Sequence, residues 1–341
     1  MIVDVIPLMT WFDKLTGFPE SSAEFVRANL SLSGDTLQSL ANGRSIAAGT
    51  FSTPSLAELR QNSELRNRAQ SKLSVSELVG DVQSLHHDPS NENAVIQVAS
   101  QFNCLEMASP RVIPERGVGI YENDRTQGPA CCICAGGGTI FRNYFVDVNG
   151  CIGQTSDNQI DCLDEIGSHF NNHETDYWRM QNGYCFPSTD GLIAIEHHLS
   201  DCNADELDLI RQKLKVGVQS GTEVTSGNCN HRLTQVFCSA VPVAYSDVEA
   251  HLWNLFPKLI LDATYESAFH LAVKNFETTG CSKLYLTLVG GGVFGNHIDW
   301  ISSAIERSLN MFANYPLDVY IVSYRNSNPS VAKIITRQNA E

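Results

Sequence analysis

The feature that most constrains the fold is an apolar run that leads into a glycine-rich turn and then into a helical pattern. Residues 284–289 are largely apolar, Gly290-Gly291-Gly292-Val293-Phe294-Gly295-Asn296 follow directly, and an apolar stripe begins at Ile298. A strand covered by helices on both faces has such a run, and apolar residues every three or four positions indicate an amphipathic helix. The region therefore predicts a strand, a tight loop and a helix, which is a building unit of α/β proteins.

The same alternation of strands and helices extends over much of the chain. Apolar runs predict strands at 94–99, 130–134, 139–146, 235–238, 283–289 and 317–324. Periodic patterns predict helices at 21–29, 56–70 and 258–279, the last one capped by Gly280. We expect an α/β fold with a central mixed sheet flanked by helices, preceded by an N-terminal helical extension. We place the extension at residues 1–90, packed on a catalytic body at residues 91–330.

Charge and hydropathy exclude several classes of partner. The net charge is −15, and no basic stripe with interleaved aromatic residues occurs, so we expect no nucleic-acid partner. No apolar run approaches the roughly 18 residues of a membrane helix, and the first residues lack the basic region of a signal peptide. We therefore expect a cytoplasmic protein with no membrane partner. An acidic chain that binds a diphosphate has to use main-chain N–H groups, which predicts glycine-rich loops.

The loop from Gly290 to Asn296 fits such a site. Consecutive glycines let main-chain N–H groups approach a ligand, and the helix that follows adds its positive N-terminal end. The loop is neither a G-x-G-x-x-G fingerprint nor a P-loop with Gly-Lys-Ser/Thr. A plain strand-to-helix turn is the alternative. Phe294, which can pack on a ribose, and Asn296, which can bond a hydroxyl, favour the ligand site.

A second group of polar residues follows the first strand of the body. It consists of Asn103, Glu106, Asp124, Gln127 and Asn143. Glu106 and Asp124 come from separate loops and can converge, and hydrolysis of a glycosidic bond needs two such groups. The alternative is that these acids cap helices or pair with the nearby Arg111, Arg116 and Arg125. Glycines 136–138 either approach the ligand or form a turn between strands.

The eleven cysteines are spread along the chain and lie mostly in apolar runs, which predicts buried, reduced thiols. Two alternatives use them in chemistry. A zinc site would combine Cys131 and Cys134 with Cys229 and His231. A nucleophilic site would pair Cys104 or Cys229 with His86, His87 or His231. Neither alternative has a second motif at the required spacing.

Several longer motifs resemble one known group of proteins. They are residues 98–107, Tyr121 with residues 124–130, residues 142–144, residues 152–155, residues 234–236 with 242–245, and residues 290–296. Together they are similar to the divergent macrodomain group typified by the Legionella effector MavL. The chain lacks the Asn-Ala-Ala-Asn stretch of common macrodomains and the Gly-Gly-Gly…Gln-Glu-Glu signature of poly(ADP-ribose) glycohydrolases.

The resemblance implies a macrodomain-like fold and a hydrolase that removes ADP-ribose from modified arginine on proteins, with ubiquitin as the candidate carrier. It places the catalytic acids at Glu106 and Asp124, with Glu115 as a third member. The loop at residues 290–296 would hold the diphosphate. The further ligand-binding residues expected are Asn103, Tyr121, Gln127 and Asn143. ADP-ribose is the expected ligand and product, and no cofactor or metal is expected to be required.

Two other functions remain open at this point. A non-catalytic reader would bind ADP-ribose on a modified protein without cleaving it. An NAD-linked oxidoreductase would need a second nucleotide-binding motif, which the sequence does not provide.

Overall fold

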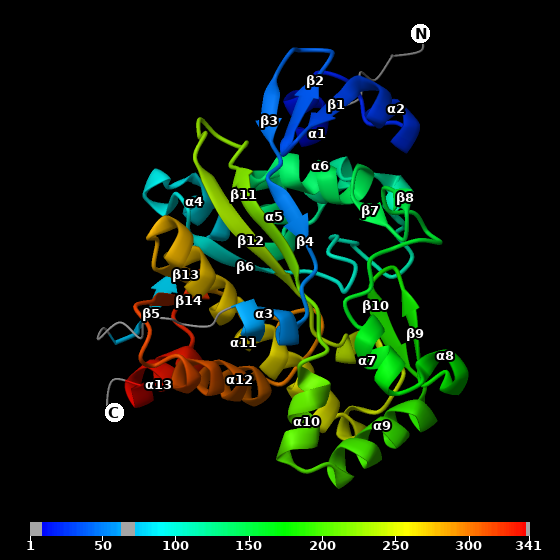
Figure 1. The fold of residues 1–341 in the computed structure, drawn as a ribbon, viewed down its shortest axis with the longest axis vertical. Coiled ribbons are helices and arrows are strands. Elements are labelled where there is room, and N and C mark those ends of the chain that lie inside the picture. Colours follow the sequence, from blue (N-terminus) through cyan, green and yellow to red (C-terminus); the bar gives the residue numbers. More distant parts are fainter. Residues whose placement is uncertain (1–8, 63–71, 339–341) are drawn as a thin grey trace.

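A computed structural model describes residues 9–62 and 72–338. Its centre is a seven-stranded mixed sheet in the order β4-β11-β12-β6-β13-β14-β5 (Figure 1). Five neighbouring strands are parallel, from β12 through β6, β13 and β14 to β5, whereas β4 and β11 run antiparallel to their neighbours. The bounds are β4 Thr50–Ser52, β5 Ser74–Val79, β6 Val95–Ala99, β11 Gly217–Glu223, β12 Arg232–Cys238, β13 Lys283–Leu286 and β14 Asp318–Ser323.

Helices cover both faces of this sheet (Figure 1). One set comprises α11 Leu255–Thr279, α12 Ile298–Met311 and α13 Pro329–Gln338. The other comprises α4 Val82–His87, α5 Gln127–Cys134 and α6 Gly136–Tyr144. Along β6, Val95 packs in a core with α11, and Ile96 and Val98 pack in a core with α5. Both faces of the strand are buried, which explains its continuous apolar run. The predicted mixed sheet flanked by helices is confirmed.

The strands predicted at 130–134 and 139–146 are wrong, because these residues form α5 and α6. Pro129 lies in the first turn of α5, where a helix does not need its N–H group. Both helices are buried almost all round, so their apolar runs resemble those of a covered strand. Glycines 136–138 lie in the first turn of α6, and a side chain at Gly137 would meet Ile46 and the main chain of Ala47 and Ala48. These glycines permit close packing and do not form a turn between strands.

The other predicted strands are confirmed as β6, β12, β13 and β14. Helices predicted at 21–29 and 258–279 correspond to α2 Ala23–Asn29 and α11, and Gly280 ends α11 with a φ of 78°. The helix predicted at 56–70 begins as α3 Leu56–Asn62, and its remaining positions lie outside the described residues.

The first 90 residues are more than a helical extension. Besides α1 Trp11–Thr16 and α2, they form a small antiparallel sheet of β1 Leu30–Ser33, β2 Thr36–Ser39 and β3 Ser45–Ala47. They also supply β4 and β5, the two edge strands of the central sheet. The domain boundary near residue 90 stays a prediction, but main-chain hydrogen bonds join both sides of it.

The segment between α6 and β11 forms a lobe beside the sheet. It contains the short strands β7 Asp147–Val148 and β8 Cys151–Ile152, the hairpin of β9 Trp178–Gln181 and β10 Tyr184–Pro187, and the helices α7 Asp164–His169, α8 Asn172–Thr175, α9 Thr189–Asp201 and α10 Ala204–Arg211. Among the described residues, no helix combines the length and apolarity needed to cross a membrane.

Candidate active site

Three loops meet at one edge of the sheet. They follow β6, β12 and β13, which are neighbouring parallel strands, so their carboxyl ends lie side by side. The loops comprise residues 100–107, 239–245 and 287–297. Ligands of α/β sheets bind at this edge.

Glu106 is the buried acid of this region. Its side chain is 5% exposed, and its Oε1 atom has no hydrogen-bond partner among the described residues. The Glu106 main-chain N–H donates to Tyr121 Oη at 3.1 Å, and this bond holds the loop. The carboxyl group lies against Gly128, in the first turn of α5, where a Cβ atom would overlap both Glu106 Oε2 and the Ala99 carbonyl. Glycine at position 128 therefore makes room for the acid.

Burial raises the pKa of the Glu106 carboxyl well above its ordinary value of 4.5. The Arg142 guanidinium opposes this shift in pKa, and the Asp124 and Cys104 side chains add to it. A carboxyl group with a raised pKa keeps its proton at higher pH and can act as a general acid.

We expect Gly128→Ala to displace the Glu106 carboxyl and to lower the free energy of unfolding by about 1–3 kcal/mol. The physical reason is the overlap of the new methyl with the Ala99 carbonyl, which belongs to the main chain and cannot rotate away. Urea denaturation would measure the loss. Gly167→Ala is the matched control, because a Cβ at Gly167 makes only ordinary contacts of 3.5 and 3.8 Å. Equal stability of the two variants would contradict the described position of Glu106.

The structure brings Asp124 to Glu106 but not Glu115. Asp124 is half-buried, lies close enough to raise the pKa of Glu106, and accepts a 2.8 Å hydrogen bond from the Thr126 N–H. Glu115 is exposed on the short 3-10 helix η2 Pro114–Arg116, where its Oε1 accepts hydrogen bonds from Ser156 N–H at 2.8 Å and Oγ at 3.1 Å. Its carboxylate thus fastens the loop at residues 153–158.

The glycine loop presents free main-chain donors. The N–H groups of Gly292, Val293 and Phe294 donate to no acceptor in the described part of the chain. Gly290 and Gly295 have positive φ values of 78° and 72°, which glycine adopts without strain. Gly291 N–H is used within the loop, donating to the Leu288 carbonyl at 3.0 Å. Three consecutive free N–H groups beside the N-terminus of α12 can receive the oxygens of a phosphate.

This loop is fastened to its neighbours. Asn296 is 5% exposed, and its Nδ2 donates to the Val241 carbonyl at 2.8 Å. Asn296 Oδ1 has no partner among residues 9–62 and 72–338. The Ala244 N–H donates to the Phe294 carbonyl at 2.9 Å. Tyr265 Oη, from α11, donates to the Thr287 carbonyl at 2.7 Å. The loop is therefore positioned before any ligand binds.

Aromatic rings connect the glycine loop with the Glu106 loop. The rings of Tyr184 on β10, Tyr245 and Phe294 lie with centroids 5.4–5.8 Å apart. Tyr184 Oη donates to the Met107 carbonyl at 2.7 Å, next to Glu106. Phe294 is 8% exposed. Phe294 is thus connected to the Glu106 loop through Tyr184.

Three residues predicted to bind ligand form hydrogen bonds within the protein, and their role in ligand binding stays a prediction. Asn103 is fully buried, with Nδ2 donating to Gln159 and Oδ1 accepting from the Leu105 N–H. The Gln127 side chain bonds the main chain of β6 twice, accepting from the Ala99 N–H and donating to the Gln97 carbonyl. Asn143 Nδ2 donates to the Pro114 carbonyl at 3.3 Å, and its Oδ1 has no partner within the described residues.

Arg142, Tyr184 and Tyr245 lie at the candidate site but were not among the site residues predicted from the sequence. Arg142 is fully buried, its Nε donates to the Cys104 carbonyl at 3.1 Å, and its guanidinium lies 3.7 Å from the centroid of the Phe237 ring. A buried cation next to the Glu106 loop needs such partners. Arg142 and Tyr245 lie in the sequence motifs at residues 142–144 and 242–245, whereas Tyr184 lies in none of the motifs.

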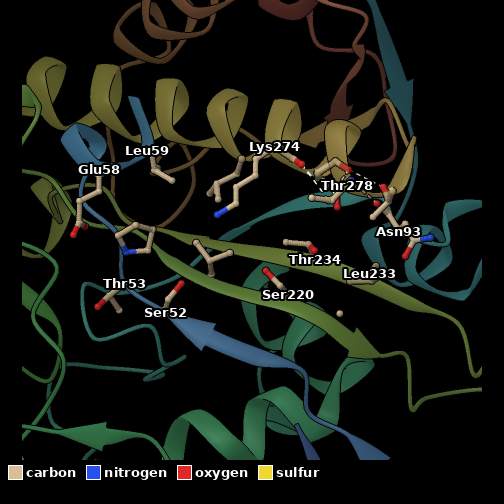
Figure 2. Close-up of a pocket in the computed structure, with 16 residues that line it drawn as sticks. Ser52, Thr53, Glu58, Leu59, Asn93, Ser220, Leu233, Thr234, Lys274 and Thr278 are labelled. Carbon is tan, nitrogen blue, oxygen red and sulfur yellow. Dashed lines mark hydrogen bonds between the residues drawn. The ribbon is translucent and has the colours of Figure 1, made fainter. Parts of the chain in front are cut away.

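A cavity of about 560 Å³ adjoins the aromatic rings. Its lining includes Tyr245, Phe186, Arg111 and Arg179. Neither arginine forms an ion pair with a described carboxylate, and Asp247 also lines the cavity. A second cavity, of about 520 Å³, lies between α11 and strands β4, β11 and β12. Figure 2 shows Lys274 and Thr278 above Ser220 and Thr234 there, toward the amino-terminal end of β12 and away from the candidate site.

The structure does not support the zinc site or the nucleophilic cysteine that the sequence left open. Cys131 and Cys134 lie in α5, and burial raises the pKa of both thiols, that of Cys134 to about 11, which disfavours the thiolates that bind zinc or act as nucleophiles. Within residues 9–62 and 72–338 there is no group of three or more His, Cys, Asp or Glu side chains placed to hold a metal ion.

Comparisons with known proteins find similarity at the level of structure. No protein-family model matches the chain, and no curated protein sequence matches it. A solved poly(ADP-ribose) glycohydrolase from Deinococcus radiodurans in complex with ADP-ribose is 10% identical, with a TM-score of 0.44 over 84% of this chain and 92% of that one. The enzyme of the same name from Thermomonospora curvata is 12% identical, with a TM-score of 0.43 over 92% of this chain and 95% of that one.

These comparisons correct the family expected from the sequence motifs. The similar solved structures are poly(ADP-ribose) glycohydrolases, so the predicted membership of the group typified by MavL is wrong. The motifs that suggested it are short, and several of them, including residues 142–144 and 124–130, lie in the buried helices α5 and α6 or at their start. Identities of 10% and 12% do not assign an activity, so the function must be inferred from this chain's own residues.

Proposed function

We propose that this protein is an ADP-ribosyl hydrolase, which cleaves the glycosidic bond between ADP-ribose and an attached group. One observation carries the proposal. Free main-chain donors after β13 and a buried acid after β6 lie at the carboxyl ends of adjacent strands, connected by the ring of Tyr184. A diphosphate binder needs the donors, and a glycosidase needs the acid.

The roles follow from the positions. The N–H groups of Gly292, Val293 and Phe294 bind the diphosphate, and the rings of Phe294 and Tyr245 pack against the adjoining sugar. The cavity beside Tyr245, with Arg111 and Arg179, receives an anionic or planar part of the substrate.

Hydrolysis breaks the bond between the anomeric carbon and the leaving atom. Protonated Glu106 gives its proton to the leaving group, the hydroxide part of a water molecule joins the anomeric carbon, and the remaining proton of that water passes to the Glu106 carboxylate and restores the acid. Asp124, which is more exposed, supplies negative charge beside the positive charge that develops on the ribose. A protonated Glu106 is not suited to hold a guanidinium, so gripping a cationic leaving group falls to Asp124.

The linkage and the carrier stay predictions. Removal of ADP-ribose from arginine, and ubiquitin as the modified protein, would be tested with an ADP-ribosyl-arginine peptide, ADP-ribosylated ubiquitin and poly(ADP-ribose) as parallel substrates. Chromatographic detection of free ADP-ribose gives the rate for each. Release from none of the three would contradict the proposed hydrolase.

A reader of ADP-ribose is the second candidate, and the position of Glu115 away from Glu106 favours it because one expected catalytic acid is missing from the site. The reader and the hydrolase differ in turnover. Saturable binding of ADP-ribose without release from any modified substrate identifies a reader.

The titration of Glu106 predicts an effect on stability. The pKa is raised in the folded chain, so the protonated carboxyl favours folding below pH 4.5, and this contribution is lost as pH rises through the folded pKa. We expect Glu106→Gln, which never ionises, to gain stability relative to the wild type as pH increases. Urea denaturation of both proteins between about pH 5, just above the ordinary pKa of a carboxyl group, and about pH 9 measures the difference. Parallel curves would show that Glu106 is not desolvated.

A further inference from the structure

Two exposed histidines from separate helices bring their ring nitrogens together in the lobe beside the sheet. His169 is the last residue of α7, and His198 lies in the last turn of α9. Their Nε2 atoms are 3.4 Å apart. The ring of Phe170, which is buried, packs edge-on against both imidazoles with centroids 5.2 Å away. The two rings are therefore held with their Nε2 atoms facing each other.

The separation of the two nitrogens matches metal coordination. Zinc binds imidazole nitrogen at about 2.0–2.1 Å in tetrahedral geometry, which places two ligand nitrogens about 3.3–3.4 Å apart. A hydrogen bond from a ring N–H usually spans about 2.7–3.2 Å. The observed distance agrees with two ligands of one ion, and without an ion one ring can donate a long hydrogen bond to the other.

We propose that His169 and His198 form a binding site for a divalent transition-metal ion, with Zn²⁺ as the expected occupant. Imidazole ligands favour zinc, copper and nickel over Mg²⁺ and Ca²⁺, which prefer oxygen ligands. No third His, Cys, Asp or Glu side chain joins the pair in the described part of the chain. Water molecules complete the tetrahedron.

A bound ion would join α7 to α9. The chain between these helices forms α8 and the β9–β10 hairpin, and Trp178 of β9 packs against Phe170 with a centroid distance of 6.2 Å. The site therefore fastens the two helices that flank the hairpin carrying Tyr184. We expect Zn²⁺ to raise the melting temperature of the full chain, because an ion that binds only the folded state stabilises it.

Titration calorimetry with Zn²⁺ tests the site on the full chain after treatment with EDTA and its removal. We expect the wild type to bind one more equivalent of Zn²⁺ than His169→Ala or His198→Ala. If a variant still binds Zn²⁺, its affinity for the ion should be more than about 10-fold below that of the wild type. Loss of a residue that only supports a metal ligand already costs about 10-fold. His198→Cys, which keeps a ligand, should retain the equivalent.

His197→Ala is the matched control. His197 is the neighbour of His198 on α9, is also exposed, and faces Asp201 with Nδ1 and Oδ2 at 3.2 Å. This variant should bind Zn²⁺ as the wild type does, and any zinc held by the eleven cysteines is common to all the proteins. The proposal is overturned if the wild type binds no more Zn²⁺ than His169→Ala and His198→Ala, or if His197→Ala loses the same equivalent.

Discussion

A leucine at position 292 is expected to abolish ADP-ribose binding in a protein that folds normally. Gly292 is exposed, has no positive φ, and a Cβ built on it meets nothing within 4 Å, so a side chain fits the fold. The same side chain fills the space in front of the free N–H groups of Gly292, Val293 and Phe294, where we place the diphosphate. We expect affinity for ADP-ribose to fall by more than about 100-fold, equivalent to about 2.7 kcal/mol, as measured by titration calorimetry.

Val293→Ala is the control for this loop. The Val293 side chain is 58% exposed, and the substitution keeps its main-chain N–H, so affinity should remain within a few-fold of the wild type. Gly291 is less informative than Gly292, because a Cβ there would lie 3.0 Å from Ile301 and 3.2 Å from the Leu288 carbonyl. Undiminished affinity in Gly292→Leu would mean that the phosphates do not bind at this loop.

Replacement of Glu106 by glutamine is expected to remove turnover and spare binding. Glutamine has the same shape but no acidic proton, and the loss of a general acid costs about 100- to 10,000-fold in rate. The dissociation constant for ADP-ribose should change little, because Glu106 acts on the leaving group and not on the diphosphate. Single-turnover release of ADP-ribose from a modified substrate, compared with calorimetry, separates the two effects.

The other acids provide internal comparisons. Asp124→Asn should slow release less than Glu106→Gln does, because Asp124 is more exposed and its charge is better screened. Glu115→Gln should act at nearly the wild-type rate, since Glu115 bonds Ser156 and lies outside the site. A rate for Glu106→Gln equal to that of Glu115→Gln would remove Glu106 from the mechanism.

Local sequence patterns predicted those strands and helices whose structure is determined by their own residues. The runs that became β6, β12, β13 and β14 are bounded by turn residues and are short, as strands are. The runs in α5 and α6 are equally apolar because these helices are buried, and periodicity cannot distinguish a helix buried all round from a covered strand. Strands β4 and β5 were missed because pairing with β11 and β14 defines them more than their sequences do.

The residues of the candidate site also fall into those that the sequence singled out and those that only the fold brings together. The sequence singled out the glycine loop from its own residues and Glu106 from the cluster of polar residues around it, and the roles of both stay predictions. Tyr184 and Arg142 could not be singled out in this way, since they reach the Glu106 loop only through the fold, Tyr184 by its bond to Met107 and Arg142 by its bond to Cys104. Asn103 and Gln127 have polar groups typical of sugar-binding sites, yet these groups bond within the protein. Gln127 bonds the main chain of β6, and Asn103 bonds the Leu105 N–H and the Gln159 side chain.

Titration calorimetry of the wild-type chain with ADP-ribose tests the central claim most directly, with AMP and ribose 5-phosphate as reference ligands. Free main-chain N–H groups shaped for a diphosphate predict saturable binding of ADP-ribose at one site per chain, with affinity at least about 10-fold, or about 1.4 kcal/mol, above that for either monophosphate. Absence of binding at millimolar ADP-ribose, or equal affinity for all three ligands, would contradict the account.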